Sequence, residues 1–234
     1  MPAKFANRSN EAELLDGTNI PRQLLFQNLR ELDLVNRTLG GHAVTLAGIK
    51  KLIHQKHKTY TIADIGCGGG DALLYIAKWA RKNKYRVQLI GVDINADAIA
   101  YMNETCKAYP EITGVVSNYQ EFLRLNNTID IVHCSLFCHH LTDLELIELF
   151  RQVKRNVKDG FVINDLHRHW FAYYSIKFLT QVLNGSSLVK SDAPLSVLRG
   201  FKKNELKKLL EQAGLEEAEV KWKWAFRYLV LLAV

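Results

Sequence analysis

The segment Asp64-Ile-Gly66-Cys-Gly68-Gly-Gly70-Asp71 decides the fold of this 234-residue chain. It follows the apolar run Tyr60–Ile65, which predicts a buried strand, and it precedes Ala72–Lys82, whose apolar spacing predicts a helix. Glycines between a strand and a helix let the backbone turn sharply and approach a ligand closely. The segment therefore predicts a strand-turn-helix unit with a binding site at its turn.

The same alternation of short strands and helices continues after this unit. Further strands are predicted at Val87–Val92, Thr113–Val116, Ile129–Cys134, Gly160–Asn164, Ala218–Trp222 and Phe226–Val234. Further helices are predicted at Ala96–Ala108, Asp143–Val157 and Lys203–Ala213. Strands that alternate with helices of this length pair in parallel through right-handed crossovers. The sequence therefore predicts an α/β fold with a doubly wound, Rossmann-like sheet of seven mostly parallel strands.

The chain outside this alternation predicts an N-terminal helical cap over residues 1–58. Apolar residues at helical spacing predict helices at Asn28–Leu39 and Thr45–His54 within the cap. Residues 59–234 then form the ligand-binding domain.

A helical lid is predicted at residues 167–200, inserted after the fifth strand. It begins with the aromatic helix Trp170–Val182 and continues through Asn184-Gly-Ser-Ser and Asp192-Ala-Pro-Leu-Ser, where the simple alternation of strands and helices is lost. The aromatic side chains either line a site for a planar apolar molecule or form the buried face of the helix. Both alternatives stay open at this point.

Composition excludes several classes of protein. Hydrophobic residues make up 48% of the chain and charged residues 24%, close to globular averages, which excludes a disordered chain. The net charge of +7 invites a nucleic-acid partner, but most basic runs fall where helices are predicted to end and where cations complement the macrodipole. No apolar stretch reaches the roughly 18 residues of a membrane span, and residues 3–37 are too polar for a signal peptide. We expect a soluble, cytoplasmic protein without an integral membrane segment.

Three carboxylates limit the kind of ligand that the turn can bind. The dinucleotide fingerprint requires a small residue where this chain has Asp71, and a carboxylate at the helix entrance repels a pyrophosphate. We expect Asp71 to cap the helix and Asp64 to face a cationic group. Asp93, at the end of the second strand, suits the two hydroxyls of a ribose. A ribose together with a cationic amino acid indicates S-adenosyl-L-methionine.

Asp64–Asp71 together with Asp93 resemble the nucleotide motifs of the class I methyltransferases. The resemblance implies S-adenosyl-L-methionine as cofactor and a polar residue after the third strand at the adenine amino group. That residue is Asn118, where many relatives carry Asp, and its carbonyl can accept the same bond. The resemblance implies this set of cofactor-binding residues: Asp64, Gly66, Cys67, Gly68, Asp93, Ile94, Asn118, Tyr119 and Ser135.

More loosely, the chain resembles bacterial methyltransferases that modify quinone-like, phenolic or polyketide products. The segments that carry this narrower resemblance are Leu32–Gly41, Asn164–His169 and Asp192–Val197. It implies a small, hydrophobic methyl acceptor.

The ends of the fourth and fifth strands are predicted to face the methyl group. Strand alternation puts Asp165, His167 and His169 on one side, so we expect His167 or His169 to be the general base, with His140 as the reserve candidate. Phe137, Arg168 and Tyr173 are predicted to contact the acceptor, although solvation of one arginine at the surface is an alternative. The four cysteines and neighbouring histidines match no common zinc spacing, so we expect reduced cysteines and no metal.

These observations predict a methyltransferase that methylates O or C of a small phenolic, quinone-like or polyketide-type acceptor. An RNA methyltransferase would need a basic groove beside the cofactor, and the strand-four end, Cys134–Phe137, lacks the Asn/Asp and two prolines typical of nucleobase amino methylation. A nicotinamide-dependent oxidoreductase shares the sheet and the ribose carboxylate, but Asp71 opposes it. A non-catalytic, cofactor-binding interaction protein would lack the polar residues at the strand ends. The acceptor atom and the oligomeric state stay open.

Overall fold

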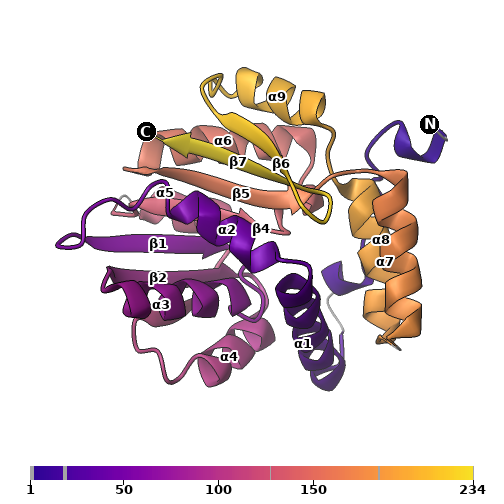
Figure 1. The fold of residues 1–234 in the computed structure, drawn as a ribbon, viewed down its shortest axis with the longest axis horizontal. Coiled ribbons are helices and arrows are strands. Elements are labelled where there is room, and N and C mark those ends of the chain that lie inside the picture. Colours follow the sequence, from indigo (N-terminus) through magenta and orange to yellow (C-terminus); the bar gives the residue numbers. More distant parts are fainter. Residues whose placement is uncertain (1–2, 18–19, 127, 184, 234) are drawn as a thin grey trace.

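The computed structural model describes residues 3–17, 20–126, 128–183 and 185–233. Within these residues one sheet has the strand order β3-β2-β1-β4-β5-β7-β6, and all strands are parallel except β7, which runs antiparallel to both of its neighbours (Figure 1). The strands are β1 (Thr59–Ile65), β2 (Arg86–Asp93), β3 (Ile112–Val116), β4 (Ile131–Ser135), β5 (Gly160–Leu166), β6 (Glu219–Lys223) and β7 (Arg227–Ala233). The predicted seven-stranded, mostly parallel sheet is confirmed.

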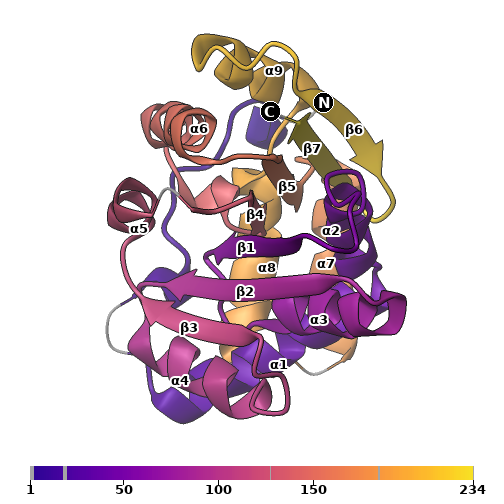
Figure 2. The same ribbon diagram turned by 90° about the vertical axis from the view of Figure 1, so that its left-hand side faces the viewer.

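Helices cover both faces of the sheet (Figure 2). One face packs against α2 (Gly41–Ile49), α3 (Asp71–Asn83) and α4 (Ala96–Thr105). The other packs against α5 (Tyr119–Leu125), α6 (Asp143–Asn156) and α9 (Lys203–Gln212). The apolar side chains of each face form their own buried core, so the strands between them are apolar on both sides, as doubly covered strands are.

The topology places a binding edge between β1 and β4. From β1 the chain moves outward to β2 and β3, and it then returns to the other side of β1 to form β4 and β5. Ligands of open α/β sheets bind where the order reverses, beyond the carboxyl ends of the strands. We call this edge, beyond Ile65, Asp93, Ser135 and Leu166, the cofactor edge.

The predicted cap has two helices, and one of them was placed wrongly from the sequence. The long helix α1 spans Arg22–Thr38, as expected in outline. The second, α2, begins at Gly41 rather than at Thr45, because Gly40 takes the left-handed conformation (φ 75°) and starts the next helix at once. The short helices η1 (Ala3–Phe5) and η2 (Leu14–Asp16) precede α1.

The lid region after β5 contains α7 (Trp170–Val182) and α8 (Ser187–Arg199), packed against each other beside the cofactor edge (Figure 1). The segment Asp192-Ala-Pro-Leu-Ser lies inside α8, and the Asp192 carboxylate accepts the backbone amides of Leu14 and Leu15 at 2.9 Å. Asn184 of the predicted lid and the end of the last predicted strand, Val234, lie outside the described residues.

Two further findings concern the surface and the cysteines. In the part of the chain that the structure describes, no helix combines the length and apolar character needed to cross a membrane. The four cysteines are unpaired and buried, as expected for reduced residues.

Candidate active site

The glycine turn after β1 has a backbone that only glycine accommodates. Gly66, Gly68 and Gly70 all have left-handed φ values of 50–73°. A Cβ on Gly66 would lie 2.2 Å from Cδ2 of Phe137, and one on Gly70 would lie 2.2 Å from Cγ of Met102. The turn is therefore held both by its dihedral angles and by side chains packed directly on its glycines.

Asp64 offers an unused buried carboxyl group behind this turn. Its side chain is 2% exposed, and neither oxygen has a hydrogen-bond partner among the described residues. The nearest polar atom, Nδ1 of His133, is 3.4 Å away, and burial lowers the pKa of His133 to about 3, so its ring is neutral. Burial and the carboxylates of Asp71 and Asp93 raise the pKa of Asp64. Buried polar groups are ordinarily paired, so Asp64 fits a ligand that brings a cation or a donor to this point.

Asp93 is oriented by the glycine turn itself. Oδ2 of Asp93 accepts the amide of Gly68 at 2.9 Å, and Oδ1 accepts the amide of Asn95 at 2.9 Å. Burial raises the pKa of Asp93, although these backbone bonds and the charge of His140 act in the opposite direction. Each oxygen keeps a second lone pair, which fits two ribose hydroxyls. Ile94, next in the chain, is 74% exposed and offers an apolar surface beside them.

The side chain predicted for the adenine amino group already has a structural role. Asn118 is the N-cap of α5, and its Oδ1 accepts the amide of Gln120 at 2.8 Å. The second lone pair of that oxygen is what remains for adenine. Tyr119 follows Asn118 in the chain. Its ring lies edge-on to that of Phe137, with 5.6 Å between the ring centroids, so the two rings pack together beside the glycine turn.

Asp71 does not cap α3 as expected. The N-cap is Gly70, and the Asp71 carboxylate instead lies 3.3 Å from Nδ2 of Asn36 and 3.4 Å from Nε2 of His42. Both partners belong to the helical cap, so Asp71 ties the cap to the glycine turn. The sequence prediction was wrong because it considered only the local helix end.

At the end of β4 the chain turns sharply over the cofactor edge. Leu136 has φ 55°, a conformation that L-residues rarely adopt and that is enriched at functional sites. The turn places half-buried Ser135 at the edge and lays Phe137 on Gly66. Cys67 and Cys134, by contrast, are buried in the two cores, so Cys67 presents only its backbone to the turn.

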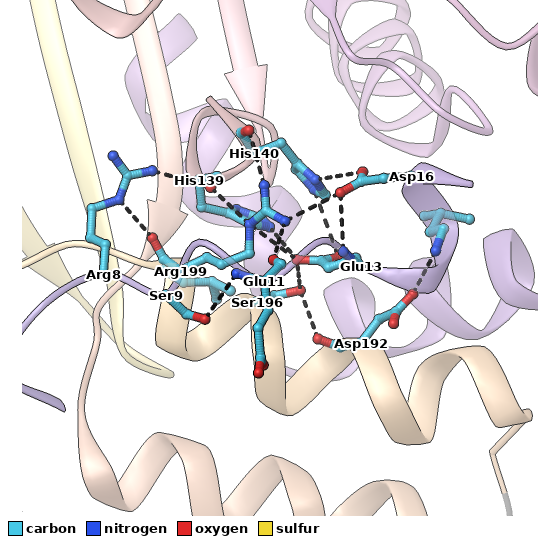
Figure 3. Close-up of polar contacts among 12 residues, drawn as sticks. Arg8, Ser9, Glu11, Glu13, Asp16, His139, His140, Asp192, Ser196 and Arg199 are labelled. Atoms are coloured by element: carbon cyan, nitrogen blue, oxygen red, sulfur yellow. Dashed lines mark hydrogen bonds and ion pairs between the residues drawn. The ribbon is translucent and has the colours of Figure 1, made fainter. Parts of the chain in front are cut away.

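Two histidines follow this turn and are held by three carboxylates, two of which, Glu13 and Asp16, are labelled with them in Figure 3. His139 is buried, with Nδ1 2.7 Å from Oδ1 of Asp165 and Nε2 3.5 Å from Oε1 of Glu13. Half-buried His140 has Nδ1 3.0 Å from Oδ1 of Asp16 and Nε2 3.9 Å from Oε2 of Glu13. Burial lowers the pKa of His139, but Asp165 and Glu13 outweigh it and raise that pKa to about 9, so His139 is an imidazolium at neutral pH.

The carboxylates Glu13 and Asp16 come from an N-terminal segment, residues 8–16, which we call the strap. Arg199 clamps it, donating Nη1 to the carbonyl of Glu11 at 2.7 Å and to Asp16 at 3.2 Å, and Nη2 to the carbonyl of His140 at 3.0 Å. Burial raises the pKa of Asp16, but His140, the amide of Glu13 and Arg199 lower it to about 2. Asp16 is therefore ionised at all ordinary pH values.

Comparison with known proteins relates this site to methyltransferases. Residues 62–160 match the family model described as a methyltransferase domain. Over these residues the chain is similar to class I methyltransferases. An uncharacterized methyltransferase of Synechocystis sp. is 28% identical over 109 residues, which are 46% of this chain and 47% of that protein. The chain thus spans about half the length of that curated relative.

Solved methyltransferase structures share the fold. An S-adenosylmethionine-dependent methyltransferase from Aquifex aeolicus superposes with a TM-score of 0.60 at 16% identity, over 92% of this chain and 100% of that chain. The plantazolicin methyltransferase BpumL, solved with the demethylated cofactor, gives a TM-score of 0.60 at 22% identity, over 86% and 78% of the two chains. The predicted Rossmann-like methyltransferase fold is confirmed.

Within the methyltransferase domain, the predicted histidines separate into two places. His140 lies at the cofactor edge, where its charge acts on both Asp93 and Asp165. The ring centroids of His167 and His169 lie 5.3 Å apart, and these rings pack against Phe226 and Tyr228 of the β6–β7 hairpin. Burial and neighbouring positive charges lower the pKa of His167 to about 4, which makes it a weak base at neutral pH.

Two of the predicted acceptor contacts are structural instead. Arg168 is 1% exposed, and its guanidinium binds the carbonyls of Phe5, Ala6 and Gly200 and the carboxylate of Glu205. Tyr173 is 8% exposed and packs on Phe5. Both anchor the N-terminus to the lid, so the assignment of Arg168 to the acceptor is corrected. Phe137 does lie at the cofactor edge, on Gly66.

The sequence analysis missed Glu13 and Asp16. Nothing in their local pattern distinguishes them from surface acids, since their partner His140 is 124 residues away from Asp16. The sequence left His139, like His140, open as a base, a residue lining the cofactor pocket or a hydrogen-bonded core residue. Its contact with Asp165 follows from the sheet order rather than from spacing.

Among the described residues, two clusters place metal-ligand atoms within 4.8 Å of one another: Glu13, His139 and His140, and Asp33, His42 and Asp71. In each, a guanidinium already approaches a carboxylate, with Arg199 3.9 Å from Glu13 and Arg37 3.2 Å from Asp33. The expectation of no metal stays a prediction.

A cavity of about 640 Å³ lies beside the strap. It is lined by residues 7–10, by His139, His140 and Arg199, and by residues at the start of α6 and along α9.

Proposed function

We propose that the protein transfers a methyl group from S-adenosyl-L-methionine to an oxygen or carbon of a small hydrophobic acceptor of phenolic, quinone-like or polyketide type. The observation that carries this proposal is the pairing, at one sheet edge, of an unpartnered buried Asp64 behind the glycine turn with a carboxylate-held His140 beyond β4. The first fits the cationic end of the methyl donor. The second supplies a base beside it.

The cofactor supplies an electrophilic methyl group on a sulfonium. Gly66–Gly68 leave room for the backbone to approach its amino-acid end, with Asp64 behind them and Ser135 facing them from β4. Asp93 would bind the ribose hydroxyls, and Ile94, Asn118 and Tyr119 would flank the base. These groups are fixed before the ligand arrives, which lowers the entropic cost of alignment.

His140 is our candidate for the general base. Ionised Asp16 takes the proton-bearing Nδ1, which leaves the lone pair of Nε2 for a substrate proton. The 3.9 Å from Nε2 to Glu13 is too long for a hydrogen bond, so this nitrogen is available. Histidine bases of this kind accept a proton from a phenol or an activated carbon acid as the methyl arrives.

The nature of the acceptor rests on the strand-four end and on the structural neighbours. The neighbours include a magnesium protoporphyrin IX methyltransferase of Synechocystis (14% identity, TM-score 0.52) and a citrinin polyketide synthase methyltransferase domain (14%, 0.56), whose names indicate small-molecule acceptors. The segment Cys134–Phe137 lacks the residues typical of nucleobase amino methylation. A nucleic-acid partner is therefore not proposed, and a cytoplasmic location stays a prediction.

The direct test supplies the protein with methyl-labelled donor and an extract of the source organism. We expect the label in an organic-extractable fraction, and we expect no transfer by the Asp93→Ala variant. Label found chiefly in RNA would show that the acceptor is RNA and not a small hydrophobic molecule. If the protein binds nicotinamide dinucleotide more tightly than the methyl donor, the cofactor assignment is wrong.

A further inference from the structure

The outer side of the lid carries an unusually apolar surface. We call it the aromatic face and define it by exposed side chains of α7 and its end and of the β6–β7 hairpin: Trp170, Phe171, Tyr174, Phe178, Val182, Leu183, Trp222 and Trp224. Phe178 is 69% exposed and Trp224 is 72% exposed. Three of the four tryptophans of the chain belong to this face. Soluble proteins rarely expose apolar patches of this kind without a binding role.

The helix and the hairpin form one continuous surface. Positions 170, 174, 178 and 182 recur every four residues and so lie along one side of α7. The ring of Phe226 in the hairpin turn lies 5.8 Å from that of Phe171 and 6.0 Å from that of Trp222. The lid aromatics other than buried Tyr173 therefore point mainly outward. They fit neither of the alternatives left open by the sequence, a buried helix face or the lining of a site.

The hairpin turn holds its aromatic residues in a costly backbone conformation. Ala225 and Phe226 have φ values of 58° and 54°, which turns ordinarily assign to Gly or Asn. A side chain with a Cβ is sterically disfavoured in this region, and such strain is concentrated at functional sites. The turn presents Trp224 and Phe226 on the surface at the expense of stability.

Positive charges predominate around this face. Helix α7 contains exposed Lys177 and no acidic residue, and the segment Lys221–Phe226 contains exposed Lys221, half-buried Lys223 and no acidic residue. Outside that segment, Glu219 is shared by Lys51 at 3.3 Å and Lys221 at 2.5 Å, which leaves this group with a net positive charge. The surface thus combines exposed tryptophan and tyrosine with lysine.

We propose that the aromatic face binds the surface of a membrane that contains anionic lipids. Tryptophan and tyrosine favour the level of lipid headgroups, and lysines nearby are attracted to anionic lipid. A helix of 13 residues is shorter than the roughly 20 residues of a span, so α7 would lie in the plane of the interface with its apolar side downward. This inference rests on the surface alone and does not require the proposed acceptor.

The test compares co-sedimentation of the full-length protein with two vesicle types: phosphatidylcholine alone, and phosphatidylcholine containing phosphatidylglycerol. We expect binding to the anionic vesicles with a blue shift of tryptophan fluorescence, and weaker binding to the neutral ones or at high salt. Phe178→Ser and a double Trp222→Ser, Trp224→Ser variant should each lower the partition coefficient by about tenfold or more. Leu144→Ser is the matched control, because Leu144 is 80% exposed on α6, outside the aromatic face.

The four altered residues, Phe178, Trp222, Trp224 and Leu144, are all exposed. Melting temperatures close to that of the wild type would show that the variants remain folded. Three results would overturn the proposal. The wild-type protein binds neither vesicle, the aromatic-face variants bind as well as the Leu144→Ser control, or light scattering shows a lipid-free dimer that the same variants dissociate. The last result would assign the face to a second copy of the chain.

Discussion

The two halves of the cofactor edge are built in different ways. On the β1–β2 side, the contacts are short in sequence and use the backbone: Asp93 is fixed by the amide of Gly68, 25 residues away. On the β4–β5 side, they are long-range and use charged side chains: His140 is held by Asp16 across 124 residues. The first half is set by a strand-turn-helix unit, and the second exists only when the strap, the lid and the sheet have come together.

This difference separates the residues proposed to bind the cofactor from those proposed to act on the methyl acceptor. A backbone-built half provides constant geometry for a constant ligand, which suits a cofactor. A half made of side chains from the strap, η3 (Cys138–His140) and α8 can vary without changing the sheet, which suits an acceptor. It also concentrates charge: Glu13, Asp16 and Asp165 surround two histidines and Arg199, so its stability depends on protonation.

The largest expected effect concerns His140. His140→Ala should lower kcat by about a hundred- to ten-thousandfold while the affinity for the methyl donor changes little, because the base acts on the acceptor. His167→Ala and His169→Ala are matched controls in the hairpin region and should retain most of the turnover. A large loss at His167 with full activity at His140→Ala would move the reactive centre to the hairpin.

The next effect isolates the backbone-built half. Asp93→Ala should weaken binding of the methyl donor and of its demethylated product, because each charge-assisted bond to a ribose hydroxyl contributes about 1.5–3 kcal/mol. Isothermal titration calorimetry measures this loss. Asp97→Ala removes a similar carboxylate from the exposed surface of α4, where it pairs only with Arg22 at 3.3 Å, and should leave affinity unchanged. Equal affinities for both variants would exclude Asp93 from the site.

The same division explains what the sequence could predict. The glycine turn, the ribose carboxylate and the sheet follow from local spacing, and all three are where the sequence placed them. The partners of Asp71 and Asn118 were wrong or incomplete, because a cap helix or a helix end competes for each side chain. The strap residues Glu13 and Asp16 could not be found, since only tertiary structure distinguishes them from surface acids.

A smaller effect tests the charge network of the strap. The pKa of His139 is raised from 6.5 to about 9, so its contribution to stability is complete below pH 6.5 and is lost as the pH rises through 9. Glu13→Gln keeps the shape of the side chain but removes one of the two carboxylates, and should lower the free energy of unfolding at pH 6.5 by roughly 1–3 kcal/mol. The dependence of melting temperature on pH between 6.5 and 9 should flatten.

The exposed Glu11, two residues earlier in the strap, provides the control for this measurement. Glu11→Gln should reproduce the wild-type pH dependence, because the described hydrogen bonds of Glu11 are made by its backbone, whose carbonyl accepts from Arg199 and whose amide donates to Ser9 Oγ. If Glu13→Gln and Glu11→Gln give the same melting curves across this pH range, Glu13 does not stabilise the imidazolium.

The smallest effect asks whether Asn118 serves the fold or the cofactor. Its Oδ1 caps α5 through the amide of Gln120, so Asn118→Ala should cost about 1 kcal/mol of stability whatever the ligand does. Asn118→Asp keeps the cap, since aspartate is an equally good N-cap residue, and it adds a charge-assisted acceptor for the adenine amino group. We therefore expect unchanged stability and affinity for the methyl donor equal to or a few-fold above that of the wild type. If Asn118→Ala loses stability yet binds the donor as tightly as Asn118→Asp does, the side chain belongs to the helix alone. Adenine is then recognised by the surfaces of Ile94 and Tyr119 without a side-chain hydrogen bond from Asn118.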